Sequence, residues 1–195
     1  MNPWVSILVM IIETLATVYL LFVILRFMLQ LARADFYNQF SQAIVKITNP
    51  LLLPLRKVIP GFWGIDLACL VLALLFHTLI AEVMAVLSFA SFINPGLVLL
   101  WALLGTIKVA TWLCMGCLLV IVVTSFVAPF SSHPALLLIR QLMEPILRPV
   151  QKIIPPVGGL DFSVLFVFLG INVLQRVLDI FAANLSLVPV IIIGY

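Results

Sequence analysis

Charged side chains are scarce in this sequence, since only 9% of its 195 residues are Asp, Glu, Lys or Arg while 65% are hydrophobic. A soluble domain usually carries about 25% charged residues. Ten basic and seven acidic side chains cannot cover a water-facing surface of this size. The composition therefore excludes an ordinary soluble domain and predicts a membrane protein.

The patterns that mark catalytic and cofactor sites are also missing. No Gly-rich phosphate loop, zinc-ligand spacing or nucleophile elbow occurs, so nothing favours hydrolysis or phosphoryl transfer. Cys114 and Cys117 have C-x-x-C spacing, but they lie in an apolar stretch and no His follows them for haem attachment. We expect a protein that is not an enzyme and holds no cofactor or metal.

Four apolar stretches are long enough to cross the roughly 30 Å hydrocarbon core of a bilayer. They cover residues 4–29, 67–89, 95–127 and 162–182. The third stretch exceeds the length that a straight crossing needs, which leaves a tilted helix and a kinked helix open. The apolar tail 185–193 is too short to cross and contains Pro189, so we expect it to lie at the membrane interface.

One motif occurs twice, at a constant offset of 95 residues, in segments 50–66 and 145–161. The identical positions include Pro50 and Pro145, Pro54 and Pro149, Lys57 and Lys152, Pro60 and Pro155, Gly64 and Gly159, and Asp66 and Asp161. Each copy ends where an apolar stretch begins. The chain is thus predicted to be an all-α membrane protein built by tandem duplication, with repeats 1–93 and 94–195 forming one membrane domain.

An amphipathic stretch precedes each motif. Its apolar residues recur at helical spacing, at Phe40, Ala43, Ile44 and Ile47 in the first repeat and at Ile139, Leu142, Met143 and Ile146 in the second. Such helices lie in the membrane plane with the apolar face toward lipid. The repeated unit is therefore a membrane span, an interfacial helix, a Pro-rich turn and a second span.

The basic residues predict the orientation of the chain. Eight of the ten Lys and Arg residues lie in or beside the connectors 30–65 and 128–160. Basic loops stay on the cytoplasmic side of bacterial membranes. We expect both connectors to be cytoplasmic, both termini to lie outside, and anionic lipid headgroups rather than nucleic acid to be the counter-charge.

The repeated motif has a local backbone interpretation. Asn49 can cap a short helix that begins at Pro50, Pro54 limits that helix, and Gly64 permits a sharp turn. Asp66 can then cap the span that follows. Asp161 occupies the same position in the second copy.

A second interpretation of the motif is a binding surface, and the two are compatible. Arg56, Lys57, Arg148 and Lys152 would then contact phospholipid phosphates or a partner at the cytoplasmic face. We leave both interpretations open.

Ionisable residues inside spans usually mark function because burying them is costly. Glu13, His77, Glu82 and Lys108 lie in the first three apolar stretches. Lys108 can pair across helices with any of the other three, and together they are the candidates for an ion or proton path. The alternative is that these groups reach the interface, as Arg176 and Asp179 would in a surface ion pair.

The doubled motif resembles that of the YggT family of bacterial integral membrane proteins. The residues that carry the resemblance are Pro50-x-x-x-Pro54-x-x-Lys57-x-Ile59-Pro60 with Gly64-Ile65-Asp66, the matching Pro145-x-x-x-Pro149-x-x-Lys152-x-Ile154-Pro155 with Gly159-Leu160-Asp161, and the upstream segment 35–42. One departure is Gln151, which stands where the first copy has Arg56; Arg148 is the candidate to supply that charge. The resemblance implies a bacterial inner-membrane protein linked to osmotic or salt-stress tolerance.

Three functional hypotheses follow. The leading one is a non-enzymatic scaffold or accessory factor in osmotic or salt-stress tolerance and envelope homeostasis, which binds lipids and an unidentified membrane protein or a second copy of itself. The second is a channel or transporter component for ions or osmolytes. The third, which the resemblance to single-copy and plastid relatives implies, is a cell-division factor or an assembly factor for a membrane cofactor protein, with Cys114, Cys117 and the histidines His77 and His133 as candidate ligands.

Overall fold

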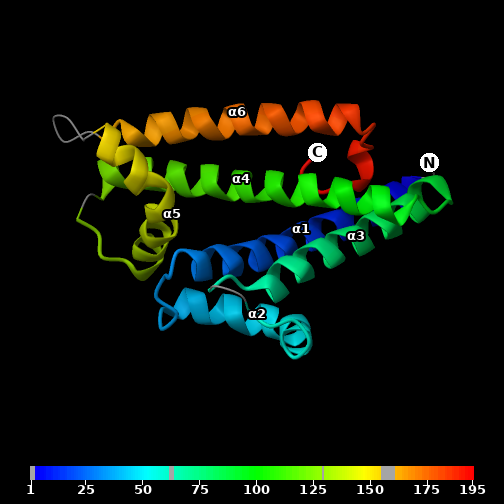
Figure 1. Ribbon diagram of the computed structural model, residues 1–195, viewed down its shortest axis with the longest axis horizontal. Helices are drawn as coiled ribbons and strands as arrows, with labels where there is room; N and C mark the ends of the chain where they lie inside the picture. The colour runs from blue at the N-terminus through cyan, green and yellow to red at the C-terminus, as the bar shows by residue number, and fades with distance from the viewer. Residues whose placement is uncertain (1–2, 62–63, 129, 155–160) are drawn as a thin grey trace.

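Helices joined by turns make up the part of the chain that the computed structural model describes, residues 3–61, 64–128, 130–154 and 161–195 (Figure 1). The elements are α1 (Pro3–Leu31), α2 (Gln39–Arg56), α3 (Leu67–Phe89), α4 (Pro95–Val127), α5 (Pro134–Ile153), α6 (Ser163–Asn184) and the short 3-10 helix η1 (Pro189–Ile191). Four of them, α1, α3, α4 and α6, are long and apolar enough to cross a membrane. The predicted all-α class with four spans is confirmed, and the third span is one unbroken helix.

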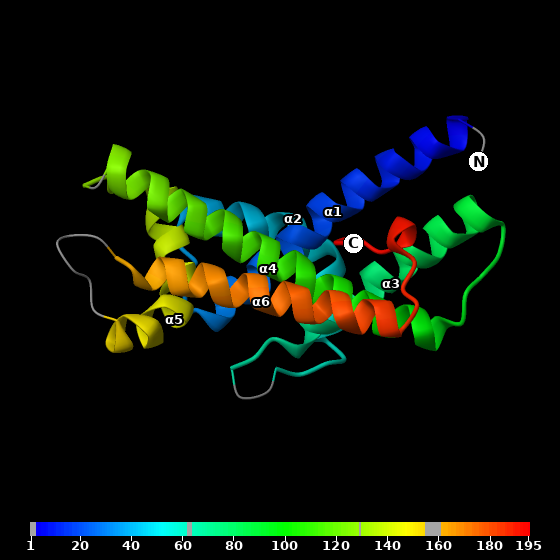
Figure 2. The same cartoon turned by 90° about the horizontal axis from the view of Figure 1, so that it is seen from above.

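The duplication is visible in the helices themselves. Helix α2 begins at residue 39 and α5 at residue 134, while α3 ends at residue 89 and α6 at residue 184, which are again offsets of 95. Within each half the two spans pack together, α1 with α3 and α4 with α6. Helix α4 also packs against α1 and α3 and so joins the halves, and α5 lies across one end of α4 and α6 (Figures 1 and 2).

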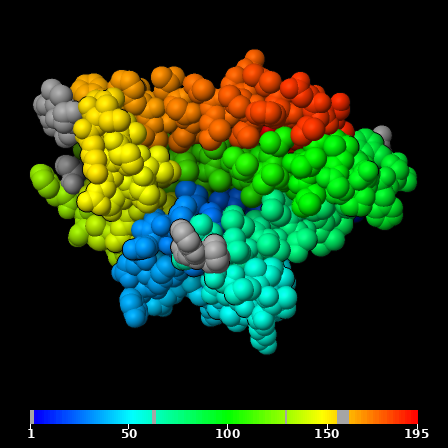
Figure 3. Space-filling view, in the orientation of Figure 1, coloured from blue at the N-terminus to red at the C-terminus, as the bar shows by residue number. Residues whose placement is uncertain are grey.

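The outer surface of the spans is apolar. Large side chains such as Trp4, Leu15, Leu119 and Leu165 are each more than 60% exposed. Apolar patches wider than a few hundred Å² are rare on soluble monomers. This surface therefore suits contact with lipid, and the space-filling view shows α5 covering one end of the α4 and α6 pair while α2 lies below α1 (Figure 3).

The motif prolines lie inside helices, which differs from the predicted short helix beginning at Pro50. Helix α2 runs through Pro50 and Pro54, and α5 runs through Pro145 and Pro149. A proline in a helix leaves the carbonyl group four residues earlier without a partner. All four prolines are exposed, so these carbonyl groups face the surroundings of the helix rather than the core.

The face of α2 that packs against the protein is not the apolar row that was predicted to face lipid, although Ile44 belongs to both. Phe40 and Ile47 are 39% and 42% exposed, and the row that packs inward consists of Ser41, Ile44, Thr48 and Leu52. The two hydroxyl groups are tolerated because each has a partner: Ser41 donates to the carbonyl oxygen of Asp35 at 2.8 Å, and Thr48 donates to that of Ile44 at 2.8 Å. In α5, which has no such hydroxyls in its buried row, Leu142 and Met143 are buried against the protein, although they belong to the row that was predicted to face lipid.

The apolar tail does not stay at the surface. After α6 the chain turns back toward the middle of the bundle, and residues 191–193 are almost completely buried against α3 and α4 (Figures 1 and 2). Gly105 of α4 makes this possible. A β-carbon at position 105 would lie 2.6 Å from Cε1 of His77 and 2.7 Å from both Cγ2 of Ile192 and the carbonyl oxygen of Ile193.

The packing of the tail predicts that Gly105→Ala destabilises the protein by about 1–3 kcal/mol, because the added methyl group overpacks a site bounded partly by backbone. The measurement is the apparent melting temperature of the detergent-solubilised protein. Gly116→Ala on the same helix is the matched control, since a β-carbon at 116 meets nothing within 4 Å. Equal melting temperatures for the two variants would contradict this account of the tail.

Candidate functional site

The corner of the first repeat is closed by a single carboxylate. Gly64 has a φ of 81°, which turns the chain after α2, and Asp66 precedes α3. One oxygen of Asp66 accepts a hydrogen bond from the backbone N–H of Cys69 at 3.2 Å, so the predicted cap is confirmed. The other oxygen binds Nη2 of Arg56, the last residue of α2. Asp66 therefore fixes both the start of a span and the end of the helix before it.

In the second repeat Asp161 likewise joins the start of α6 to α5, without an ion pair. Asp161 accepts a hydrogen bond from the backbone N–H of Ser163 at 3.0 Å and another from Nε2 of Gln151 at 2.8 Å. Gln151 thus binds the Asp161 carboxylate as Arg56, 95 residues earlier, binds that of Asp66. Burial works against ionisation of Asp161, but the hydrogen bonds from Ser163 and Gln151 outweigh it and hold the pKa of the carboxyl below its ordinary value. These hydrogen bonds to Asp161 therefore contribute their full stabilisation at pH values above the ordinary carboxyl pKa. The contribution is lost as the pH falls through the lowered pKa of Asp161.

The remaining motif residues lie at the surface or outside the described part of the chain. Lys57 and Lys152 are exposed. Arg148 is exposed as well and faces Glu144 at 3.7 Å, one turn earlier on α5. Pro155 and Gly159 fall outside the described residues, so the predicted turn of the second copy is left as a prediction.

The two connectors are tied to each other at the start of α2 and α5. The backbone N–H of Asp35 donates to Oε1 of Gln141 at 3.0 Å, and Nδ2 of Asn38 donates to the carbonyl oxygen of Pro134 at 2.8 Å. The rings of Phe40 and His133 lie 6.1 Å apart. These contacts join segments 35–57 and 133–152 into one unit, which we call the connector platform.

Arg26 is a part of the first corner that sequence analysis did not single out. It lies in α1 and is only 4% exposed. Its Nη1 atom donates to the carbonyl oxygen of Val45 at 3.1 Å, to Oγ1 of Thr48 at 2.5 Å and to Oδ1 of Asn49 at 2.9 Å, all in α2. The available signal was an arginine inside the last turns of an apolar span.

Arg26 and Arg56 line the same cavity between α1, α2 and the start of α3. The cavity has a volume of about 560 Å³, and Gln30 and Asp66 also face it. Two guanidinium groups and one carboxylate therefore meet at one open site. Such a set can bind an oxyanion through charge-assisted hydrogen bonds.

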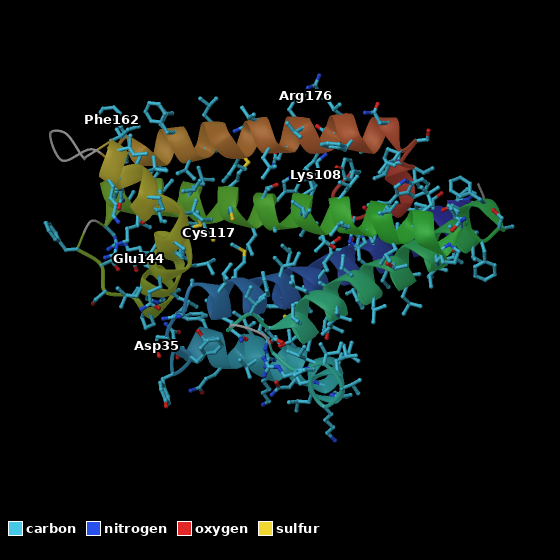
Figure 4. The ribbon with its side chains drawn as sticks, viewed as in Figure 1. Asp35, Lys108, Cys117, Glu144, Phe162 and Arg176 are labelled. Atoms are coloured by element: carbon cyan, nitrogen blue, oxygen red, sulfur yellow. The ribbon has the colours of Figure 1, made fainter. Side chains whose placement is uncertain are left out.

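The intramembrane polar residues are held separately. Nζ of Lys108 binds Oδ1 of Asp179 at 2.5 Å and lies 3.7 Å from the centre of the Tyr195 ring (Figure 4). The structure thus pairs Lys108 with α6 and the tail rather than with Glu13, His77 or Glu82. Arg176 points away from the bundle, so Asp179 forms no ion pair with it (Figure 4).

The other three intramembrane candidates, His77, Glu82 and Glu13, form no ion pair with a described residue. Nδ1 of His77 lies 3.0 Å from Oγ1 of Thr106, and Glu82 accepts a distant hydrogen bond, at 3.4 Å, from the backbone N–H of Ile93. Within the described residues the Glu13 carboxylate has no ion-pair partner. Glu13 and Lys108 occupy equivalent positions 95 residues apart, but the four residues do not converge on one path.

The cysteines lie in the core. Cys114 and Cys117 are buried in α4, where Cys117 faces the junction with the first repeat (Figure 4). Over the described ranges, no three His, Cys, Asp or Glu side chains come close enough together to hold a metal ion.

Comparison with known proteins agrees with the doubled corner. The family model described as CCB3/YggT matches residues 5–88 and 100–182. The chain belongs to this family. It is 43% identical over 168 residues to a protein of Pseudomonas aeruginosa (85% of this chain, 84% of that protein) and 36% identical over 166 residues to YggT of Escherichia coli K12 (84% of each chain). A protein of Vibrio alginolyticus is 41% identical over 162 residues, which cover 83% of this chain and 87% of the relative. No solved structure matches the chain.

The two corners predict unequal effects of the same substitution. Asp66→Asn can still accept the Cys69 N–H but leaves Arg56 without a carboxylate, so we expect a loss of about 1.5–3 kcal/mol of stability. Asp161→Asn is the matched control, because its partner Gln151 is neutral and the site is exposed, and we expect about 0.5 kcal/mol or less. Chemical or thermal unfolding in detergent measures both. An equal loss in the two variants would show that the ion pair does not distinguish the corners.

Proposed function

We propose that the protein is a non-enzymatic scaffold of the bacterial inner membrane that acts in osmotic or salt-stress tolerance and envelope homeostasis. The single observation that supports this most is the connector platform, in which hydrogen bonds from Asp35 and Asn38 join the two connectors across the repeats. A joined platform presents one fixed surface to a partner, which two independent loops would not do. The stress role is the one that the family resemblance implies.

The charge of the platform supports an orientation and a type of partner. Lys57 and Lys152 are exposed at equivalent positions of the two repeats, and most other basic residues lie in the same connectors. We place both connectors on the cytoplasmic side and both termini outside, following the distribution of basic residues in bacterial membrane proteins. The partners in this proposal are anionic lipid headgroups together with a membrane protein or a second copy of the chain.

Charge reversal at the two lysines tests the scaffold. In a bacterial strain that lacks its own copy of the gene, the double variant Lys57→Glu and Lys152→Glu is expected to lose most of the rescue of growth in high-salt medium. The reason is that a negative charge repels anionic headgroups and any partner that recognises a basic surface.

The control for this test is Lys57→Arg with Lys152→Arg, which keeps both charges at the same exposed positions and should rescue growth as the wild type does. Membrane levels of both proteins are compared by immunoblot. Full rescue by the charge-reversed protein at normal membrane levels would show that the function does not depend on the platform.

A scaffold also predicts that the protein conducts nothing by itself. We expect proteoliposomes containing the purified protein to retain trapped potassium and a small dye during osmotic downshift as well as protein-free liposomes do. The physical basis is that Lys108 is engaged by Asp179 and does not form a path with Glu13, His77 and Glu82. Protein-dependent release that disappears in Glu13→Gln or Lys108→Met would favour the channel hypothesis instead.

A further inference from the structure

The cavity beside Arg26 contains a buried positive charge without its own counter-ion. Arg26 is 96% buried, and its three hydrogen bonds all go from Nη1 to neutral oxygen atoms. Within the described part of the chain, its Nη2 and Nε atoms donate no hydrogen bond. A buried guanidinium is expensive unless an anion balances it. The arrangement therefore leaves room for an anion from outside the chain.

The other charged groups of the cavity leave a net charge of about one unit. Asp66 is the only carboxylate among the lining residues that the structure describes, and Arg56 already binds one of its oxygens while the other caps α3. Two guanidinium groups against one carboxylate give a net charge of +1. A phosphodiester carries one negative charge, and guanidinium groups bind phosphate oxygens through paired hydrogen bonds.

The position of the cavity favours a lipid as the source of the phosphate. The cavity lies where the span α1 ends and the amphipathic helix α2 begins, which is the level at which headgroups meet the hydrocarbon core. Phe36 and Ile59 form apolar parts of its wall. A volume of about 560 Å³ accommodates a phosphoglycerol group with the start of its acyl chains.

The second repeat provides an internal comparison. The positions equivalent to Arg26, Gln30 and Arg56 hold Ile121, Ser125 and Gln151. A cavity of about 510 Å³ exists there too, with Ile121, Ser125 and Asp161 in its wall, but its lining is otherwise apolar and holds no cation. The two cavities share only these three equivalent positions, since the rest of the second one is formed by α4 and α6, and the pair of arginines is present in the first copy alone.

We propose that the cavity lined by Arg26, Gln30, Arg56 and Asp66 binds the phosphate group of one anionic phospholipid. The inference rests on the proposed function only in placing the connectors at the membrane surface, and it makes the first repeat the lipid-specific half of the platform. Arg26 holds the phosphate from the buried side and Arg56 from the exposed side. The positions equivalent to Arg26 and Arg56 in the second repeat, Ile121 and Gln151, carry no charge.

The test uses the variant that the second repeat already contains. Arg56→Gln removes one cation, while glutamine at the equivalent position 151 holds Asp161 at 2.8 Å, so the corner should still close. The full-length protein is purified in mild detergent, mixed with equal amounts of phosphatidylglycerol and phosphatidylcholine, and examined by native mass spectrometry. We expect the wild type to retain one phosphatidylglycerol in preference to phosphatidylcholine, and Arg56→Gln to lower that retention about tenfold.

Two further variants control the test. Arg176→Gln removes one exposed basic charge from α6, outside both connectors, and should leave the retention unchanged. Arg56→Lys keeps the charge and the ability to pair with Asp66 but loses the planar fork, so an intermediate retention at unchanged melting temperature is expected. This variant decides the question if Arg56→Gln proves unstable.

Other outcomes overturn the proposal in distinct ways. Equal losses in Arg56→Gln and Arg176→Gln would mean that lipids follow general surface charge. Stabilisation of the wild type, but not of Arg56→Gln, by inorganic phosphate without any retained lipid would assign the cavity to a free phosphate. Because the measurement is made in detergent, without a partner, its failure is separate from a failure of the growth test on Lys57 and Lys152.

Discussion

The start of a membrane span that follows an in-plane helix poses a hydrogen-bonding problem on which the rest of this structure depends. The first backbone N–H groups of the span have no partner within the helix and enter a region where lipid cannot supply one. Asp66 and Asp161 meet this need with one oxygen and use the other to hold the helix that came before. Because one carboxylate contacts both helices, it fixes the angle between them. The positions of the platform and of the cavity beside Arg26 depend on that angle.

Duplication preserved this geometry while the charges diverged. Arg56 became Gln151 in the second copy, where the clamp is a neutral hydrogen bond, and Arg26 is matched by Ile121. Within the spans it is the second repeat that has the ion pair. Lys108 pairs with Asp179, whereas the equivalent positions of the first repeat hold Glu13 and the buried Met84. The first half therefore carries a buried Arg26, and the second half a partly exposed pair of Lys108 and Asp179. The two copies share the corner, and each half has its own polar sites in addition.

The sequence was sufficient for the features that depend on local patterns. Hydropathy located the four spans, the offset of 95 residues located the repeats, and the position of Asp66 predicted a helix cap. Features that depend on a distant partner were missed. Thr48 lies inward because Arg26, 22 residues away, needs an acceptor, and no periodicity of α2 alone contains that information. The same holds for the tail, which packs inward because Gly105 lacks a side chain.

The polar groups inside the bundle connect the spans with the segments outside them. The hydrogen bonds of Arg26 all go to α2, and Lys108 lies against the ring of Tyr195 at the end of the tail. In an isolated pair of spans Arg26 would lose its partners, and its charge would be strongly unfavourable there, whereas Lys108 would keep Asp179 of α6 and lose only the ring of Tyr195. Helix α2 is thus a condition for keeping the charge of Arg26 within the bundle. It follows that spans, connectors and tail fold as one cooperative unit, and that a partner which displaced α2 would also expose the charge of Arg26.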